Sequence, residues 1–88
     1  MSFRVIAVEP TPNPNAMKFV LDRPCSDGTI SFLKLEQGAG HPLAEKLFAI
    51  SGVASLLFLG DFITVNKTPS AAWSKVQQAV EKVLATDE

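Results

Sequence analysis

Two largely apolar runs in residues 52–67, GVASLLFLGDFITVNK, separated by Gly60 and Asp61, predict a β-hairpin around which the chain is organised. Residues 53–59 and 62–67 read as two strands, joined by a two-residue turn in which Gly60 supplies the positive φ of a type II′ turn. That turn length fixes the pairing, and successive side chains point to opposite faces. One face carries Leu56, Phe58, Ile63 and Val65, and the other carries Leu57, Leu59, Phe62 and Thr64.

Both faces of this hairpin are largely apolar, although a sheet with one face in water normally alternates apolar and polar side chains. Two interpretations follow. Either both sides are covered within the domain, or one side binds a partner.

Residues 3–9 are rich in β-branched side chains and predict a further strand. The way side chains divide between two faces predicts two more strands, at residues 16–21 and 29–35. The strands at residues 3–9 and 16–21 are separated by Thr11, Pro12, Asn13, Pro14 and Asn15. Two prolines fix φ in this segment and push the residues before them toward extended backbone. We therefore expect a stiff connection between two antiparallel neighbours.

Helical spacing of apolar residues predicts two helices. The first begins at Pro42, a residue favoured at the first helical position, and Gly52 is its expected stop. The second is expected to open at Thr68 and Pro69, and Thr86–Glu88 to fray. Its apolar stripe contains Trp73, Val76, Val80, Val83 and Leu84. We expect Trp73 to rest on the sheet face that bears Phe58 and Ile63.

The resulting order, β-β-β-α-β-β-α, predicts an α+β fold. Amphipathic helices among short strands indicate a two-layer sandwich, with a mostly antiparallel sheet and both helices on one face. Two helices cover one sheet face only, so the face bearing Leu57, Leu59 and Phe62 has no obvious cover.

Composition narrows the class of protein. The chain has 88 residues, of which 47% are hydrophobic, and this suffices for one domain with its own core. A net charge of −1 without a basic stripe argues against nucleic-acid binding. One cysteine excludes an internal disulfide and fits a reducing compartment, and no apolar run reaches the ~18 residues of a membrane span. We expect a soluble, cytoplasmic domain.

Candidate chemistry is limited to His41 and Cys25. His41 adjoins a helix start, so helix capping or a surface loop is the simplest interpretation, while a catalytic role assembled in space stays open. Cys25 follows Arg23, which would lower the pKa of its thiol, but Asp22 and Asp27 oppose this effect. We expect an exposed thiol without a role.

One cysteine and one histidine cannot supply the four ligands of a structural zinc or an iron–sulfur cluster. The sequence also lacks phosphate-binding loops and nucleophile motifs. We therefore expect that the protein is not an enzyme and has no catalytic or metal-ligating residue. We also expect that this chain alone binds no cofactor.

The segment Thr11–Phe19, TPNPNAMKF, resembles the T-P-N-P-N-x-x-K-F signature that opens the N-terminal domain of Nfu (NifU-like) iron–sulfur cluster scaffold proteins. Three further stretches are similar in the same order: residues 42–48 (PLAEKLF), 50–53 (ISGV) and 60–65 (GDFITV), with Trp73 downstream. The resemblance covers nearly the whole chain and implies one Nfu N-terminal-like domain over residues 1–88.

Full-length Nfu proteins carry a second domain whose C-x-x-C pair binds the cluster, and Cys25 does not match that motif. The resemblance thus implies a stand-alone version of the N-terminal domain, which meets an iron–sulfur cluster only through a partner. A non-enzymatic accessory domain that binds a cluster carrier or recipient protein is our first hypothesis. The alternatives are a small metal-handling protein or enzyme using His41 and Cys25, and a self-associating homodimer.

Two groups of residues are candidates for partner binding. The first is the apolar group of the hairpin, and the second is the signature segment, which either recognises a partner or only holds the connection between two strands in shape. The candidates are Leu57, Leu59 and Phe62, and Thr11, Pro12, Asn13, Pro14 and Asn15.

Overall fold

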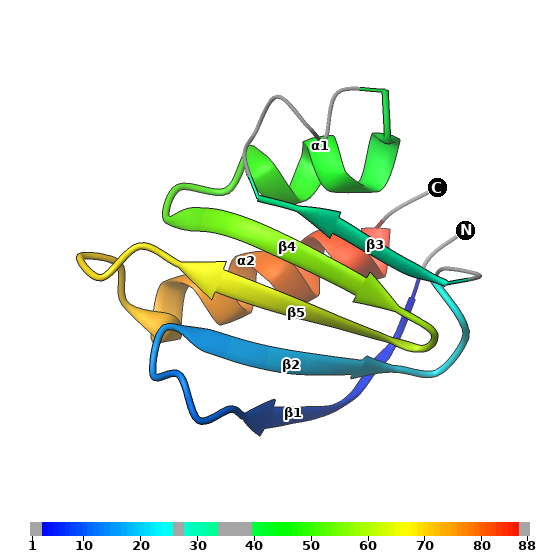
Figure 1. Ribbon diagram of the computed structural model, residues 1–88, viewed down its shortest axis with the longest axis horizontal. Helices are drawn as coiled ribbons and strands as arrows, with labels where there is room; N and C mark the ends of the chain where they lie inside the picture. Colours follow the sequence, from blue (N-terminus) through cyan, green and yellow to red (C-terminus); the bar gives the residue numbers. More distant parts are fainter. Residues whose placement is uncertain (1–2, 26–27, 34–39, 87–88) are drawn as a thin grey trace.

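In the computed structural model, which describes residues 3–25, 28–33 and 40–86, five strands form one antiparallel sheet (Figure 1). The strand order is β1-β2-β5-β4-β3, and every neighbouring pair is antiparallel. The strands are β1 (Val5–Pro10), β2 (Ala16–Leu21), β3 (Thr29–Phe32), β4 (Val53–Leu59) and β5 (Phe62–Lys67), and the helices are α1 (Pro42–Phe48) and α2 (Trp73–Thr86). The predicted α+β class and element order are confirmed.

The hairpin of β4 and β5 has the predicted register. Leu59 pairs with Phe62, Phe58 with Ile63, Leu57 with Thr64 and Leu56 with Val65. Gly60 has a φ of 58°, and no non-glycine residue in the described part has a positive φ. A positive φ at the first turn position alone is the mark of a type II′ turn, so the sequence pattern and the backbone agree.

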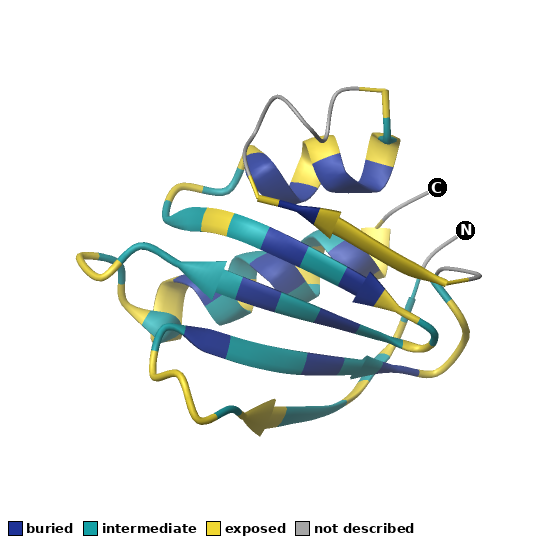
Figure 2. Ribbon diagram, viewed as in Figure 1, coloured by how far each residue is buried: buried dark blue, intermediate teal, exposed yellow. Residues whose placement is uncertain are grey.

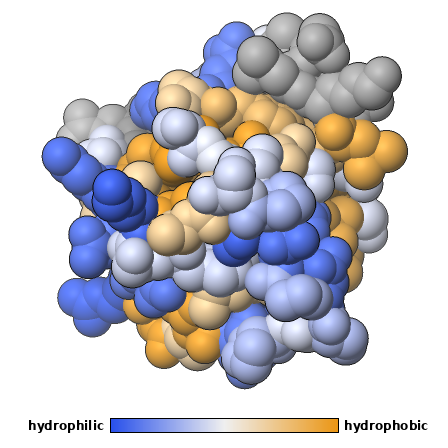
Figure 3. Space-filling view, turned by 90° about the vertical axis from the view of Figure 1, so that its left-hand side faces the viewer, coloured by the Kyte–Doolittle hydropathy of each residue, from blue (hydrophilic) through white to orange (hydrophobic). Residues whose placement is uncertain are grey.

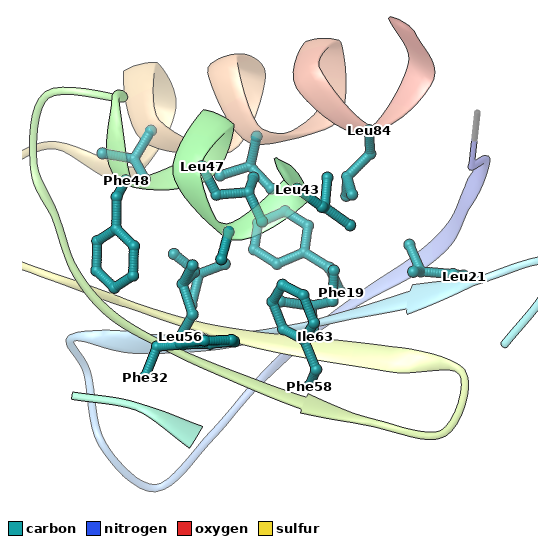
Figure 4. Close-up of a cluster of buried hydrophobic side chains, with 14 residues drawn as sticks. Phe19, Leu21, Phe32, Leu43, Leu47, Phe48, Leu56, Phe58, Ile63 and Leu84 are labelled. Atoms are coloured by element: carbon teal, nitrogen blue, oxygen red, sulfur yellow. The ribbon is translucent and has the colours of Figure 1, made fainter. Parts of the chain in front are cut away.

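Both helices pack on the same face of the sheet and enclose the core with it (Figure 4). Figure 2 shows the buried positions of the strands alternating with partly exposed ones. Burying one such large apolar side chain contributes about 1.5–3 kcal/mol. The core comprises Phe19, Leu21, Phe32, Leu56, Phe58, Ile63 and Val65 from the sheet, Leu43, Ala44, Leu47 and Phe48 from α1, and Val76, Val80 and Leu84 from α2.

The predicted start of the second helix at Thr68 and Pro69 is wrong. The Thr68 amide donates to the carbonyl of Gly52 (2.7 Å), and the Thr68 carbonyl accepts from the Ala71 amide (3.0 Å), which closes a separate turn. The helix begins after this turn, because the amides of Lys75 and Val76 both donate to the carbonyl of Ala72 (3.1 Å each). Thr68 therefore belongs to a turn that contacts a distant segment and not to the helix.

Other boundaries shift by less. β1 begins at Val5, and β3 ends at Phe32, while positions 34 and 35 of the predicted third strand lie outside the described residues. α1 ends at Phe48, and the positive φ of Gly52 belongs to the turn that follows it. Thr86 is the last residue of α2 rather than a frayed end, and residues 87–88 lie outside the described part. Neither described helix offers an apolar stretch long enough to cross a bilayer.

Candidate functional site

The face of the sheet opposite the helices is not covered by any described helix, and it faces the viewer in Figure 1. We call it the open sheet face. Cross-strand pairing places Val20 beside Phe62 and Phe62 beside Leu59, with Leu57 two positions along β4. Leu59 is 36% exposed, and the other three side chains are half-buried. The face on which sequence reasoning found no obvious cover thus carries an apolar group spread over three adjacent strands.

Lys18 borders this apolar group. Its Nζ lies 4.2 Å from the centroid of the Phe62 ring and 3.7 Å from Oε1 of Glu9. A cation–π contact at an exposed site is worth about 0.5–1 kcal/mol, whereas an exposed ion pair contributes little. The ammonium group therefore shields one side of Phe62 and leaves a charged rim beside the apolar group.

Sequence reasoning did not include Lys18 and Val20 among the candidate residues. The alternation in residues 16–21 already places these two side chains on one face of their strand. It does not reveal that β2 pairs with β5, which brings Val20 and Lys18 next to Phe62.

The Thr11–Asn15 segment is held by hydrogen bonds within itself. The Thr11 hydroxyl oxygen accepts from the Asn13 amide (3.1 Å) and can donate its proton to the carbonyl of Asn13 (2.9 Å) or Ala16 (3.1 Å). Oδ1 of Asn13 accepts from the Asn15 amide (2.9 Å), and the Asn13 carbonyl accepts from the Ala16 amide (3.0 Å). These bonds fix the loop between β1 and β2, as side chains of Asn and Thr commonly do in turns.

The same segment is also tied to two distant elements. The Asn15 carbonyl accepts from the Lys67 amide (2.8 Å), and Oδ1 of Asn15 accepts from the Lys67 ammonium group (3.0 Å). Nε1 of Trp73 donates to the carbonyl of Pro14 (3.0 Å). These contacts support the interpretation that the signature holds the connection in shape, although Pro12, Asn13 and Pro14 remain exposed.

Trp73 lies at the first position of α2 and packs against the edge of the core, half-buried. The deeper positions over the sheet belong to Val76, Val80 and Leu84, each no more than 2% exposed. That Trp73 rests on Phe58 and Ile63 stays a prediction, whereas its indole N–H donates to the carbonyl of Pro14 in the signature segment.

His41 caps α1, as one of the two sequence interpretations expected. Its Nδ1 accepts from the Ala44 amide (3.2 Å), which satisfies one of the free N–H groups at the helix start. The imidazole packs edge-on against the rings of Phe32 and Phe58, with centroids 5.3 and 5.1 Å away. The side chain of His41 therefore has a structural role, as a helix cap that packs against two aromatic rings.

Cys25 is half-buried rather than exposed, so that expectation is wrong. Its Sγ donates toward the carbonyls of Gly60 (3.2 Å) and Phe62 (3.6 Å), because the turn of the hairpin lies against it. Burial raises the pKa of the Cys25 thiol above its ordinary value, and the charge of Asp61 adds to the increase. Asp27 lies outside the described residues.

His41 therefore contacts the start of α1 and two aromatic rings, whereas Cys25 contacts the turn between β4 and β5. Within residues 3–25, 28–33 and 40–86, no three His, Cys, Asp or Glu side chains come together in a way that suits a metal ion.

The raised pKa of Cys25 predicts a poorly reactive thiol, because the thiolate is the nucleophile. Alkylation by iodoacetamide at pH 8 should be several-fold slower in the native protein than in the same chain unfolded in guanidinium chloride. The fold favours the protonated form, so its contribution to stability is present below the ordinary thiol pKa of 9.0 and is lost as the pH rises through the folded pKa. Equal alkylation rates in the two states would contradict this assignment.

Residues 6–87 match the family model for the scaffold protein Nfu/NifU N-terminal domain. The chain belongs to the Nfu N-terminal domain family. It is 42% identical to a NifU-like protein of Schizosaccharomyces pombe over 82 residues, which cover 90% of this chain and 32% of that protein. It is 32% identical over 83 residues to conserved virulence factor C of Staphylococcus haemolyticus, covering 91% of this chain and 22% of that protein.

The crystal structure of protein SAV1430 from Staphylococcus aureus is similar to this Nfu N-terminal domain, with a TM-score of 0.75 and 28% identity. The match covers 91% of this chain and 96% of that chain. By contrast, the chain spans about a third or less of the length of the two curated relatives.

Proposed function

We propose that this Nfu N-terminal domain is a non-enzymatic accessory domain of iron–sulfur cluster assembly, which binds a cluster carrier or recipient protein through its open sheet face. The observation that carries the proposal is the apolar group of Leu57, Leu59 and Phe62 on a sheet face that no described helix covers. Membership of the Nfu/NifU scaffold family supplies the biochemical setting.

The size of the apolar group favours a transient partner over a permanent dimer. Three strands about 4.8 Å apart give an apolar centre about 10 Å wide, which corresponds to a patch of a few hundred Å². A stable homodimer usually buries about 800 Å² on each partner. The charged pair of Lys18 and Glu9 beside the apolar group matches the polar rim of a protein interface.

The single cysteine favours a role in which this domain assists cluster assembly without supplying the cluster ligands. Iron–sulfur clusters ordinarily take four cysteine ligands, and the sequence contains only Cys25. That thiol points at two main-chain carbonyls, and its raised pKa opposes the thiolate form that binds iron. A partner that carries the cluster on its own C-x-x-C pair would make ligands from this domain unnecessary.

The proposal is tested by titrating the isotope-labelled chain with the C-x-x-C domain of an Nfu scaffold, loaded with its cluster, and following backbone amide signals. We expect signals of Val20, Leu57, Leu59 and Phe62 to shift, and the visible absorbance to stay with the scaffold domain. The same domain without its cluster serves as the comparison. Absence of binding to both forms, or shifts confined to the helices, would overturn the proposal.

Reconstitution of the isolated chain provides a separate prediction. After anaerobic incubation with iron and sulfide followed by desalting, we expect no stoichiometric cluster on the monomer, because one thiol cannot replace four cysteine ligands. Visible spectroscopy and iron analysis measure this outcome. A cluster that co-elutes with the monomer would contradict the prediction, whereas one seen only in a dimer and lost in Cys25→Ser would identify a shared site.

A further inference from the structure

A groove of about 480 Å³ opens between the turn that follows α1 and the first turns of α2. Its floor includes Ile50, Val76 and Ala79, and its rim includes Ser51, Ser70 and Lys75. Figure 3 views the molecule from the side on which these turns lie, and apolar surface there is bordered by hydrophilic side chains. The groove is formed by the helical layer and is separate from the open sheet face.

The two walls of this groove are held together by close backbone contacts. Gly52 approaches Ala71 so closely that a Cβ on the glycine would lie 2.7 Å from the Cβ of Ala71. The Thr68 amide donates to the Gly52 carbonyl at 2.7 Å. The groove is therefore preformed, and a ligand would lose little free energy in ordering it.

The floor of the groove is apolar, and the rim carries the positive charge of Lys75. Val76 is 2% exposed, and the half-buried Ile50 and Ala79 offer aliphatic contact. Lys75 is exposed and has no ion-pair partner among the described residues, and no carboxylate lines the groove. The hydroxyl groups of Ser51 and Ser70 add hydrogen-bonding capacity beside it.

We propose that this groove binds an acidic, aliphatic segment of a partner protein, with one aliphatic side chain on the floor and a neighbouring carboxylate beside Lys75. The charge of the rim selects an acidic segment, and the aliphatic floor selects a leucine-like side chain rather than a charged one. This site goes beyond the proposed function, because it uses a different surface and a different kind of ligand.

The test uses the blocked tripeptide acetyl-Glu-Leu-Glu-amide and amide signals of the labelled chain. We expect signals of Ser51, Ser70, Lys75 and Ala79 to shift, and those of the open sheet face to stay in place. The uncharged acetyl-Gln-Leu-Gln-amide and the shortened acetyl-Glu-Ala-Glu-amide should both bind more weakly. Shifts on the open sheet face alone, or none at millimolar peptide, would overturn this site without affecting the proposed function.

Two variants define the contacts. Lys75→Gln should weaken binding of the acidic peptide about two- to fivefold, the range expected for an exposed ion pair, and leave the uncharged peptide unaffected. Ala79→Leu should fill the floor and abolish binding, whereas Gln78→Leu adds the same side chain at the neighbouring exposed position of α2 and should not. Thermal melts establish that each variant is folded. Unchanged binding in folded Ala79→Leu would contradict the proposal.

Discussion

Replacing Trp73 by alanine is expected to lower the free energy of unfolding by about 3 kcal/mol, the lower part of the range for large aromatic truncations. The side chain is half-buried at the core edge, and its Nε1 donates to the carbonyl of Pro14. The variant loses both the packing and the link between α2 and the loop before β2. Because small domains have total stabilities of about 5–15 kcal/mol, this is a large share.

Denaturant unfolding followed by far-ultraviolet circular dichroism measures the effect, since the variant lacks the fluorescent indole. Trp73→Phe is the matched control, because it retains an aromatic ring but cannot donate to the Pro14 carbonyl. Loss of one hydrogen bond should cost about 1 kcal/mol. A loss below about 1 kcal/mol in Trp73→Ala would show that the indole contributes as a surface group only.

The second large effect is expected at Gly52, where alanine should destabilise the fold by roughly 2–5 kcal/mol. Gly52 has a φ of 100°, a left-handed conformation that costs other residues about 1–2 kcal/mol. A Cβ there would also lie 2.7 Å from the Cβ of Ala71 and 3.3 Å from Cγ2 of Val76. Accommodating such overpacking typically lowers the free energy of unfolding by about 1–3 kcal/mol more.

Gly40→Ala separates these two causes. Gly40 has a similar φ of 88°, and among the described residues nothing lies within 4 Å of the Cβ that alanine would add. Urea unfolding should show that Gly40→Ala costs only the backbone strain and Gly52→Ala costs more. If the two variants are equally destabilised, close packing between Gly52 and α2 is not important for stability.

The sequence predicted the hairpin best, because its register follows from local chemistry. A two-residue turn with glycine at its first position determines which residues pair and therefore which side chains share a face, and the face of Leu56, Phe58, Ile63 and Val65 is the buried one. The start of α1 at Pro42 was confirmed for the same reason.

Features that depend on contacts between distant segments were not predictable from the sequence. The Thr68 amide, at the predicted start of the second helix, donates instead to the carbonyl of the distant Gly52. Cys25 is half-buried because the hairpin turn, 35 residues away, supplies a carbonyl to its thiol. The pairing of β2 with β5, which brings Lys18 onto Phe62, likewise requires the sheet order. Local patterns do not encode any of these contacts.

The sequence left two roles open for the signature segment, partner recognition and holding the connection between β1 and β2 in shape, and only the structure distinguishes between them. Prolines and asparagines predict a stiff loop, and the hydrogen bonds of Thr11, Asn13 and Asn15 confirm a shaped connection. The bond from Trp73 to Pro14 spans 59 positions and has no local pattern. The loop therefore ranks behind the open sheet face as the surface for a partner.

Docking through the open sheet face is tested by the affinity of the double variant Leu59→Ser with Phe62→Ser for a cluster-loaded Nfu C-x-x-C domain. The matched control is Ile6→Ser, which removes an apolar side chain, 60% exposed, from the edge strand β1 outside the apolar group. Both proteins should stay folded in thermal melts, because the replaced side chains are not core residues.

We expect calorimetric titration to show at least about tenfold weaker binding for the double variant, because central apolar contacts of the interface are lost. Ile6→Ser should bind like the unmodified chain. A folded double variant with unchanged affinity would contradict the open sheet face as the docking surface, and a double variant that unfolds would show that Leu59 and Phe62 belong to the core.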